Sequence, residues 1–172
     1  MGHINDVQKG GKAAVIMSRH LDIVGDGTGL DNVIADYTVP QVFKIAPAAG
    51  EIFRIERMIG FIQDGGNFTA EGYGGLVALT NGIALEYDVK GSVVQLLEEA
   101  VVSNAEWGGQ CFDTRYDNFG AGDNMFVFRW TFSKAGGPII LNGDLGEEIR
   151  LTAQDNFTGL VKQKFLVQGL SA

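Results

Sequence analysis

Apolar and polar residues alternate along much of this chain, which is the pattern of β-strands that bury one face and expose the other. The clearest run is MFVFRWTFS, residues 125–133. Every second position in it is aromatic: Phe126, Phe128, Trp130 and Phe132. An aromatic side chain can bury about 150–250 Å², so we predict a strand with this face in the core.

The C-terminal segment from Glu147 to Gly169 contains two alternating arms separated by DNFTG, residues 155–159. Asp, Asn and Gly favour the backbone conformations of a short loop. The apolar residues of the arms are Ile149, Leu151 and Ala153 in the first, and Val161, Phe165 and Val167 in the second. We predict a hairpin whose two antiparallel strands close a β-sandwich.

The longest strand candidate is EIFRIERMIGFIQ, residues 51–63, in which Phe53, Ile55, Ile59 and Phe61 share a parity. Arg57 interrupts that face, and Gly60 indicates a bulge or a close backbone approach. Arg57 has two interpretations, as a rim residue beyond the core layer or as one partner of a pair at a subunit interface.

Other segments predict shorter elements. Residues 13–17 and 19–24 form a strand, and Pro40 and Pro47 restrict residues 41–46 to an edge or a short strand. Asn81-Gly82 predicts a hairpin between residues 76–79 and 83–89. Residues 92–102 (SVVQLLEEAVV) carry a helical stripe, although their valine pairs favour a strand; we predict a helix.

Length and composition fit one domain. The 172 residues suffice for a core without disulfides, and 25 glycines, about twice the usual share, indicate many turns. Residues 1–12 are polar and are predicted to form a flexible N-terminal arm, with a single β-sandwich domain over 13–172.

The formal net charge of −8 argues against binding nucleic acid or an anionic membrane surface. No segment approaches the ~20 apolar residues of a membrane helix, and the N-terminus shows no signal-peptide pattern. We therefore expect the chain to fold in the cytoplasm of the cell that makes it.

Residues for catalysis or metal binding are sparse. The two histidines are far apart in the sequence, Cys111 is the only cysteine, and phosphate- and dinucleotide-binding motifs are missing. Asp22, Asp26, Asp31 and Asn32 offer oxygen ligands around a GDGTGLDN stretch, which is interpreted as turns or as a calcium site. We predict no enzyme, cofactor or metal, with a small hydrolase built from distant carboxylates as a further hypothesis.

Two glycine-rich segments carry the candidate contact residues. Residues 64–75 contain Phe68 and Tyr73 and form either a contact loop or a connector. Residues 104–124 contain Trp107, Phe112, Arg115, Tyr116 and Phe119. This second segment is interpreted as an interface, as a loop that packs its own aromatic residues, or as a cation site at Asp113, Asp117 and Asp123.

The segment GDLGEEIRLTAQDNFTGLVKQKFLVQG resembles the last hairpin of small jelly-roll virion proteins of tailed bacteriophages. The order of EIFRIERMIGFIQD, NGIALEYD, SNAEW and the aromatic strand is similar as well, so the resemblance covers residues 40–170. It implies a β-sandwich that decorates or cements a capsid or forms part of a tail or fibre. The N-terminal arm would then serve attachment or subunit swapping, and no catalytic residue is implied.

We thus expect an all-β protein, a jelly-roll sandwich of about eight antiparallel strands with one short helix. The function expected first is a non-enzymatic capsid decoration or cement subunit of a virion, a homo-oligomer with a trimer favoured, bound to the major capsid protein or another virion protein. The alternative is a carbohydrate- or receptor-binding module of a phage tail or fibre, which would need exposed aromatic residues such as Trp107, Tyr116 and Tyr73.

Overall fold

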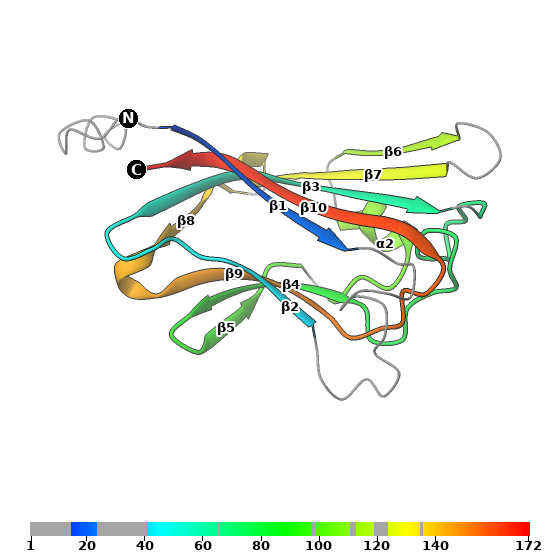
Figure 1. Ribbon diagram of the computed structural model, residues 1–172, viewed down its shortest axis with the longest axis horizontal. Coiled ribbons are helices and arrows are strands. Elements are labelled where there is room, and N and C mark those ends of the chain that lie inside the picture. Colours follow the sequence, from blue (N-terminus) through cyan, green and yellow to red (C-terminus); the bar gives the residue numbers. More distant parts are fainter. Residues whose placement is uncertain are drawn as a thin grey trace.

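Antiparallel strands in two layers make up the described part of the computed structural model, and the short α-helix described in it lies at one end (Figure 1). The structure describes residues 15–23, 41–64, 66–97, 99–110, 113–118, 124–134 and 136–172. The predicted N-terminal arm, the GDGTGLDN stretch, Cys111, Phe112 and Phe119 lie outside the described residues.

The two layers are called sheet A and sheet B here. Sheet A runs in the order β1 (Val15–Ile23), β10 (Leu160–Ser171), β3 (Ile52–Asp64), β7 (Asn124–Thr131) and β6 (Asp113–Asn118), with β8 (Ile139–Asn142) also paired to β3. Sheet B runs in the order β2 (Gln41–Ile45), β9 (Glu147–Ala153), β4 (Ile83–Val89) and β5 (Ser92–Gln95). The edge position predicted for residues 41–46 is confirmed by β2.

The strand pairs define a jelly roll. Going inward from both ends of the chain, β1 pairs with β10, β2 with β9, β3 with β7 and β8, and β4 with β5, all antiparallel. The chain therefore forms one long antiparallel ribbon folded over into two sheets. The predicted all-β jelly-roll sandwich is confirmed. The strand number exceeds eight because β6 is added at an edge and the 3-10 turn at Phe132–Lys134 separates β7 from β8.

The predicted aromatic strand forms the centre of the core. Phe126, Phe128, Trp130 and Phe132 are at most 7% exposed. Gly60 on β3 lies directly opposite Phe128, and a Cβ atom at Gly60 would come 1.8 Å from Cζ of that ring. The close backbone approach predicted at Gly60 is therefore confirmed.

A β-bulge on β3 changes which residues face the core. The pairing of β3 with β10 skips one residue, Glu56, between Ile55 and Arg57. Phe53 and Ile55 are buried before the bulge, and Met58 and Ile62 are buried after it. The prediction that Ile59 and Phe61 share the core face is wrong, because one extra residue in a strand reverses its alternation.

The predicted C-terminal hairpin is also wrong. β9 belongs to sheet B and β10 to sheet A, so residues 154–159 cross from one layer to the other. A second register shift at Val161 leaves that side chain 44% exposed and buries Gln163 instead. A period-two pattern identifies each strand, but it does not identify the neighbouring strand.

The tight hairpin lies at Lys90-Gly91 instead of Asn81-Gly82. Lys90 and Gly91 have φ angles of 51° and 88°, which two-residue hairpin turns require, and they connect β4 to β5. The N–H groups of Thr80, Asn81 and Gly82 all donate to the buried carboxylate of Asp155, at 2.7–3.1 Å. Asn81-Gly82 is thus a loop fixed by the crossing between the sheets.

The helix predicted over residues 92–102 is wrong, since this segment begins with β5 and its Val101 forms a bridge with Ile83. The short helix is α2 (Asn104–Gln110), in a segment whose composition predicts a loop. The Ser103 hydroxyl accepts from the Glu106 N–H at 3.3 Å, and the Glu106 carboxylate accepts from the Val102 N–H. This spacing of Ser and Glu is close to a capping box and was the overlooked signal.

Candidate interaction surfaces

Two of the predicted contact residues are core residues. Trp107 and Tyr73 are 0% exposed. The Trp107 ring stacks on Phe128 with centroids 3.9 Å apart, and the Tyr73 hydroxyl donates to Oε1 of Gln163 at 2.6 Å. Burial raises the pKa of Tyr73 well above its ordinary value. Neither side chain can contact a glycan or a partner, which corrects the interface assignment for both residues.

The other candidates lie at several places. Phe68 is partly buried against the core, with its ring 6.4 Å from that of Phe126. Arg57 is exposed and lies at the bulge of β3, which fits its interpretation as a rim residue. Arg115 and Tyr116 lie on β6, opposite Val127 and Phe126 in register. The register does not place Arg57 beside Arg115 or Tyr116, because β7 lies between β3 and β6.

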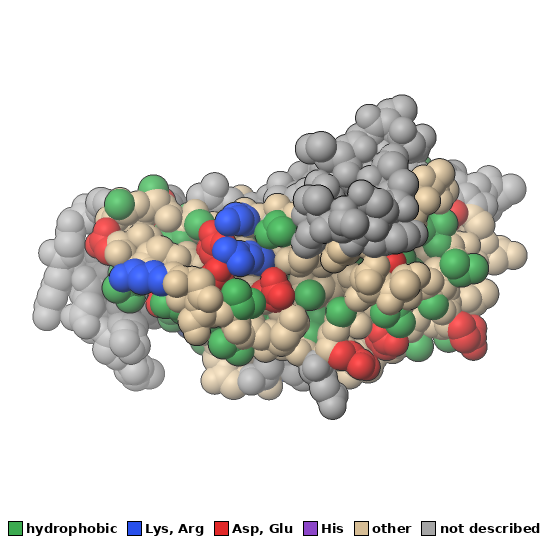
Figure 2. Space-filling view, turned by 90° about the horizontal axis from the view of Figure 1, so that it is seen from below, with side chains coloured by type: hydrophobic (Ala, Val, Ile, Leu, Met, Phe, Trp, Pro, Cys, Tyr) green, Lys and Arg blue, Asp and Glu red, His purple; other side chains and the backbone are tan. Residues whose placement is uncertain are grey.

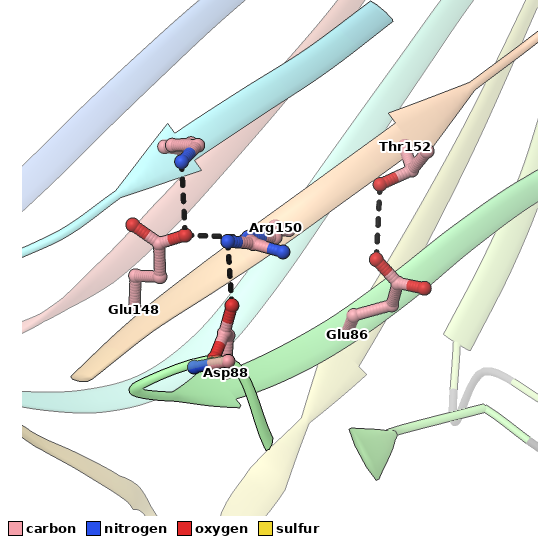
Figure 3. Close-up of polar contacts among 7 residues, drawn as sticks. Glu86, Asp88, Glu148, Arg150 and Thr152 are labelled. Atoms are coloured by element: carbon pink, nitrogen blue, oxygen red, sulfur yellow. Dashed lines mark hydrogen bonds and ion pairs between the residues drawn. The ribbon is translucent and has the colours of Figure 1, made fainter. Parts of the chain in front are cut away.

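The outer face of sheet B is a network of ion pairs. Arg150 on β9 contacts the carboxylates of Asp88 and Glu148, and Nζ of Lys44 lies 3.2 Å from Glu148 (Figure 3). The hydrogen bond to Glu148 is the main cause of a raised Arg150 pKa. The Thr152 hydroxyl donates to the Glu86 carboxylate at 3.0 Å.

The register explains this network. Lys44, Arg150 and Glu86 lie side by side on neighbouring strands, and Glu148 lies beside Asp88 one step further along. Figure 2 shows this side of the molecule, with basic and acidic side chains next to each other near its middle. The charges of this face are satisfied largely by one another.

The outer face of sheet A has a different character. Its outward positions on β3, β7, β8 and β10 combine eight apolar side chains with charged and polar ones. The apolar residues are Ile52, Ile59, Phe61, Met125, Val127, Ile140, Leu166 and Leu170. Ile52 and Ile140 are 42% and 48% exposed, and the other six are partly exposed. No helix or strand among the described residues packs against this face.

The alternation of apolar residues does not reveal this surface, because it places Ile59 and Phe61 on the core face. A signal was present, since Arg57 interrupts the apolar parity and a charged residue in such a position is typical of a shift in alternation. The outward position of Ile59 and Phe61 follows from moving the parity by one residue at Glu56, just before Arg57.

The edge of sheet B at β5 is a smaller exposed surface. All four residues of β5 are exposed, including Val93 at 43% and Val94 at 55%. Within the described residues β5 pairs only with β4, so its other edge has backbone groups available for pairing.

The described residues contain no group of three or more His, Cys, Asp and Glu side chains that could bind a metal ion. The positions proposed for calcium near Asp26 and Asp31 lie outside the described part of the chain. No helix in the described part is long and apolar enough to cross a membrane.

Comparison with known proteins does not identify a family for this chain. No family model matches the chain, and no curated protein matches it. A solved structure, a serine protease of Aeromonas sobria, matches with 15% identity and a TM-score of 0.29, covering 92% of this chain and 27% of that one. The chain thus spans about a quarter of that structure, and similarity at this level does not bear on fold or function.

Proposed function

We propose that this chain is a non-enzymatic structural protein of a virion, a capsid decoration or cement subunit that binds the particle surface through its outer face of sheet A. One observation carries the proposal: a broad sheet face with eight apolar side chains that no described element covers. Soluble monomers rarely expose large contiguous apolar patches unless the patch binds something.

The jelly roll suits this role because it presents the apolar residues on a rigid surface. The outward side chains belong to hydrogen-bonded strands whose inward neighbours, such as Met58, Ile62 and Phe128, are fully buried. A pre-ordered surface loses little conformational entropy when it binds. Many copies on a lattice would add avidity to a modest single contact.

The carbohydrate-binding alternative receives no such support. Two of the three aromatic residues it would use, Trp107 and Tyr73, are inaccessible in the core. Our proposal for partners is therefore the major capsid protein or another virion protein, with a homo-oligomer, a trimer favoured, as the bound form.

Purified particles provide the test. We expect the chain to co-purify with them, and we expect particles that lack it to break at lower temperature or in lower salt. Adding back the purified chain should restore the stability of these particles. Sedimentation velocity gives the mass in solution, and a strict monomer that does not bind particles would contradict the proposal.

A further inference from the structure

We infer that the outer face of sheet A docks onto an acidic protein surface with an apolar centre, and not onto a second copy of this chain. This inference rests on the proposed function and specifies the chemistry of the particle surface that the subunit recognises. The pattern of charge around the apolar residues of this face carries it.

The described outward positions of the face are mainly basic where they are charged. On β3, β7 and β10 they comprise five basic residues, Arg54, Arg57, Arg129, Lys162 and Lys164, and one acidic residue, Glu56. The register adds Asp22 on β1 and Asp113, Arg115 and Asp117 on β6 at the two edges of the face. This excess stands out in a chain whose formal net charge is −8. A basic patch on an acidic protein attracts an acidic partner and repels basic ones.

Acidic residues are near some of these basic ones but not near all of them. Arg54 pairs with Glu56 at 2.6 Å, and the register places Asp22 opposite Lys164 and Asp113 opposite Arg129. By contrast, the neighbours of Arg57 across the sheet are Gln168 and Thr131, and the neighbour of Lys162 on β3 is Gln63. Among the described strand pairs, Arg57 and Lys162 thus have no acidic residue directly opposite them.

These two residues lie on either side of the apolar centre. Leu166 and Ile59 are neighbours in register, and Phe61 and Val127 are neighbours one step further along the sheet. Arg57 follows at one end of this group, and Lys162 at the other. The arrangement is that of an interface with an apolar core and a charged rim.

A second copy does not fit this rim. Two sheet A faces packed together would bring Arg57 and Lys162 close to the basic residues of the other copy, and like charges across an interface cost free energy. The outer face of sheet B offers few free carboxylates, because Asp88 and Glu148 already contact Arg150 and Glu86 accepts from Thr152. We therefore assign the carboxylates that meet the rim to a different protein.

An anionic lipid surface could also satisfy basic residues. The negative charge of the whole chain opposes it, since the surface potential of such a membrane repels a protein with a net charge of −8. We therefore make vesicle binding one outcome of the test.

The test compares two double charge reversals that change the net charge equally. Arg57→Glu with Lys162→Glu alters the rim on sheet A, and Lys44→Glu with Lys90→Glu alters exposed lysines of sheet B. Binding to particles that lack the chain is measured by sedimentation, and circular dichroism confirms that each variant folds. Arg57→Gln with Lys162→Gln, which adds no negative charge, gives an independent second measurement.

We expect the sheet A reversal to weaken particle binding by about tenfold or more and the sheet B reversal to leave it within about twofold. Binding of the wild-type chain should weaken as NaCl rises from about 0.05 to about 0.5 M, because salt screens rim charges. The glutamine variant should lie between wild type and reversal.

The outcomes separate the two proposals. A wild-type chain that does not bind particles overturns the proposed function and this inference together. If the wild-type chain binds particles and the two reversals weaken binding equally, or neither weakens it, this inference alone is overturned. It is also overturned if the sheet A reversal dissociates a homo-oligomer. Binding of the wild-type chain to vesicles containing phosphatidylserine, and not to particles, would overturn it as well.

Discussion

The outer faces of sheet A and sheet B arise from the same alternation of side chains, yet they satisfy their polar groups in different ways. On sheet B, Arg150 lies between Asp88 and Glu148, and nearly every charge has a partner on a neighbouring strand. On sheet A, basic residues surround Ile59 and Phe61, which no described element covers. A sheet with internally paired charges gains little from a partner, whereas a sheet with uncovered apolar area gains from burial.

The largest expected effect tests whether the outward apolar residues of sheet A are separate from the core. Phe126→Ala should lower the free energy of unfolding by about 3–5 kcal/mol, because the ring is fully buried. Phe61→Ala should lower it by only about 1 kcal/mol, because that ring lies on the partly exposed outer face. Urea unfolding of both variants measures the difference, and equal losses would mean that the outer face of sheet A is covered.

The next effect concerns the buried carboxylate of sheet B. Asp88 is 2% exposed, accepts the Gly91 N–H at 2.6 Å and pairs with Arg150. Asp88→Ala should therefore cost about 2 kcal/mol in urea unfolding. Glu86→Gln is the control, since an amide oxygen can still accept from Thr152, and a cost for Glu86→Gln as large as that for Asp88→Ala would contradict this account of the face.

The third prediction concerns Tyr87 of sheet B and the dependence of the free energy of unfolding on pH. Burial, then the hydrogen bond to Glu147, raises the pKa of Tyr87 from 10.0 to about 12. Above about pH 10 the unfolded chain loses this proton while the folded chain retains it, so stability should fall as the pH rises toward 12. Tyr87→Phe should make the fall between pH 9 and pH 11.5, measured by urea unfolding, less steep, and an unchanged slope would argue against the Glu147 contact.

The smallest effect is expected at the exposed end of the same network. Lys44 is 53% exposed, and its Nζ lies 3.2 Å from Glu148. Lys44→Ala should change the free energy of unfolding by less than about 0.5 kcal/mol, because exposed ion pairs are screened and cost side-chain entropy. A loss similar to that of Asp88→Ala would show that the network acts as one unit.

The sequence predicts where the strands lie along the chain better than it predicts which strands pair with each other. The aromatic positions of β7 and of Phe132, which follows it, identify the core face because burying four large side chains outweighs local preferences. The pairing of β9 and β10 could not be predicted, since residues 154–159 suit a hairpin loop and a crossing between sheets equally well. The crossing becomes evident only when Asp155 is seen to bind the N–H groups of residues 80–82.

The candidate surface was hidden for a related reason. A bulge of one residue at Glu56 turns Ile59 and Phe61 outward, and an alternation count cannot place that extra residue. The helix α2 and the turn at Lys90-Gly91 could have been predicted from the sequence. Ser103 and Glu106 have capping-box spacing, and glycine in a two-residue turn permits a positive φ.

The position of β10 has a consequence for how the molecule is made. β10 lies between β1 and β3 near the middle of sheet A, but it leaves the ribosome after all the strands from β1 to β9. Until then the backbone groups of β1 and β3 that it will pair with have no partner from β10. Sheet A can be completed only after synthesis has passed residue 171, so folding should be slow and sensitive to aggregation in nascent chains.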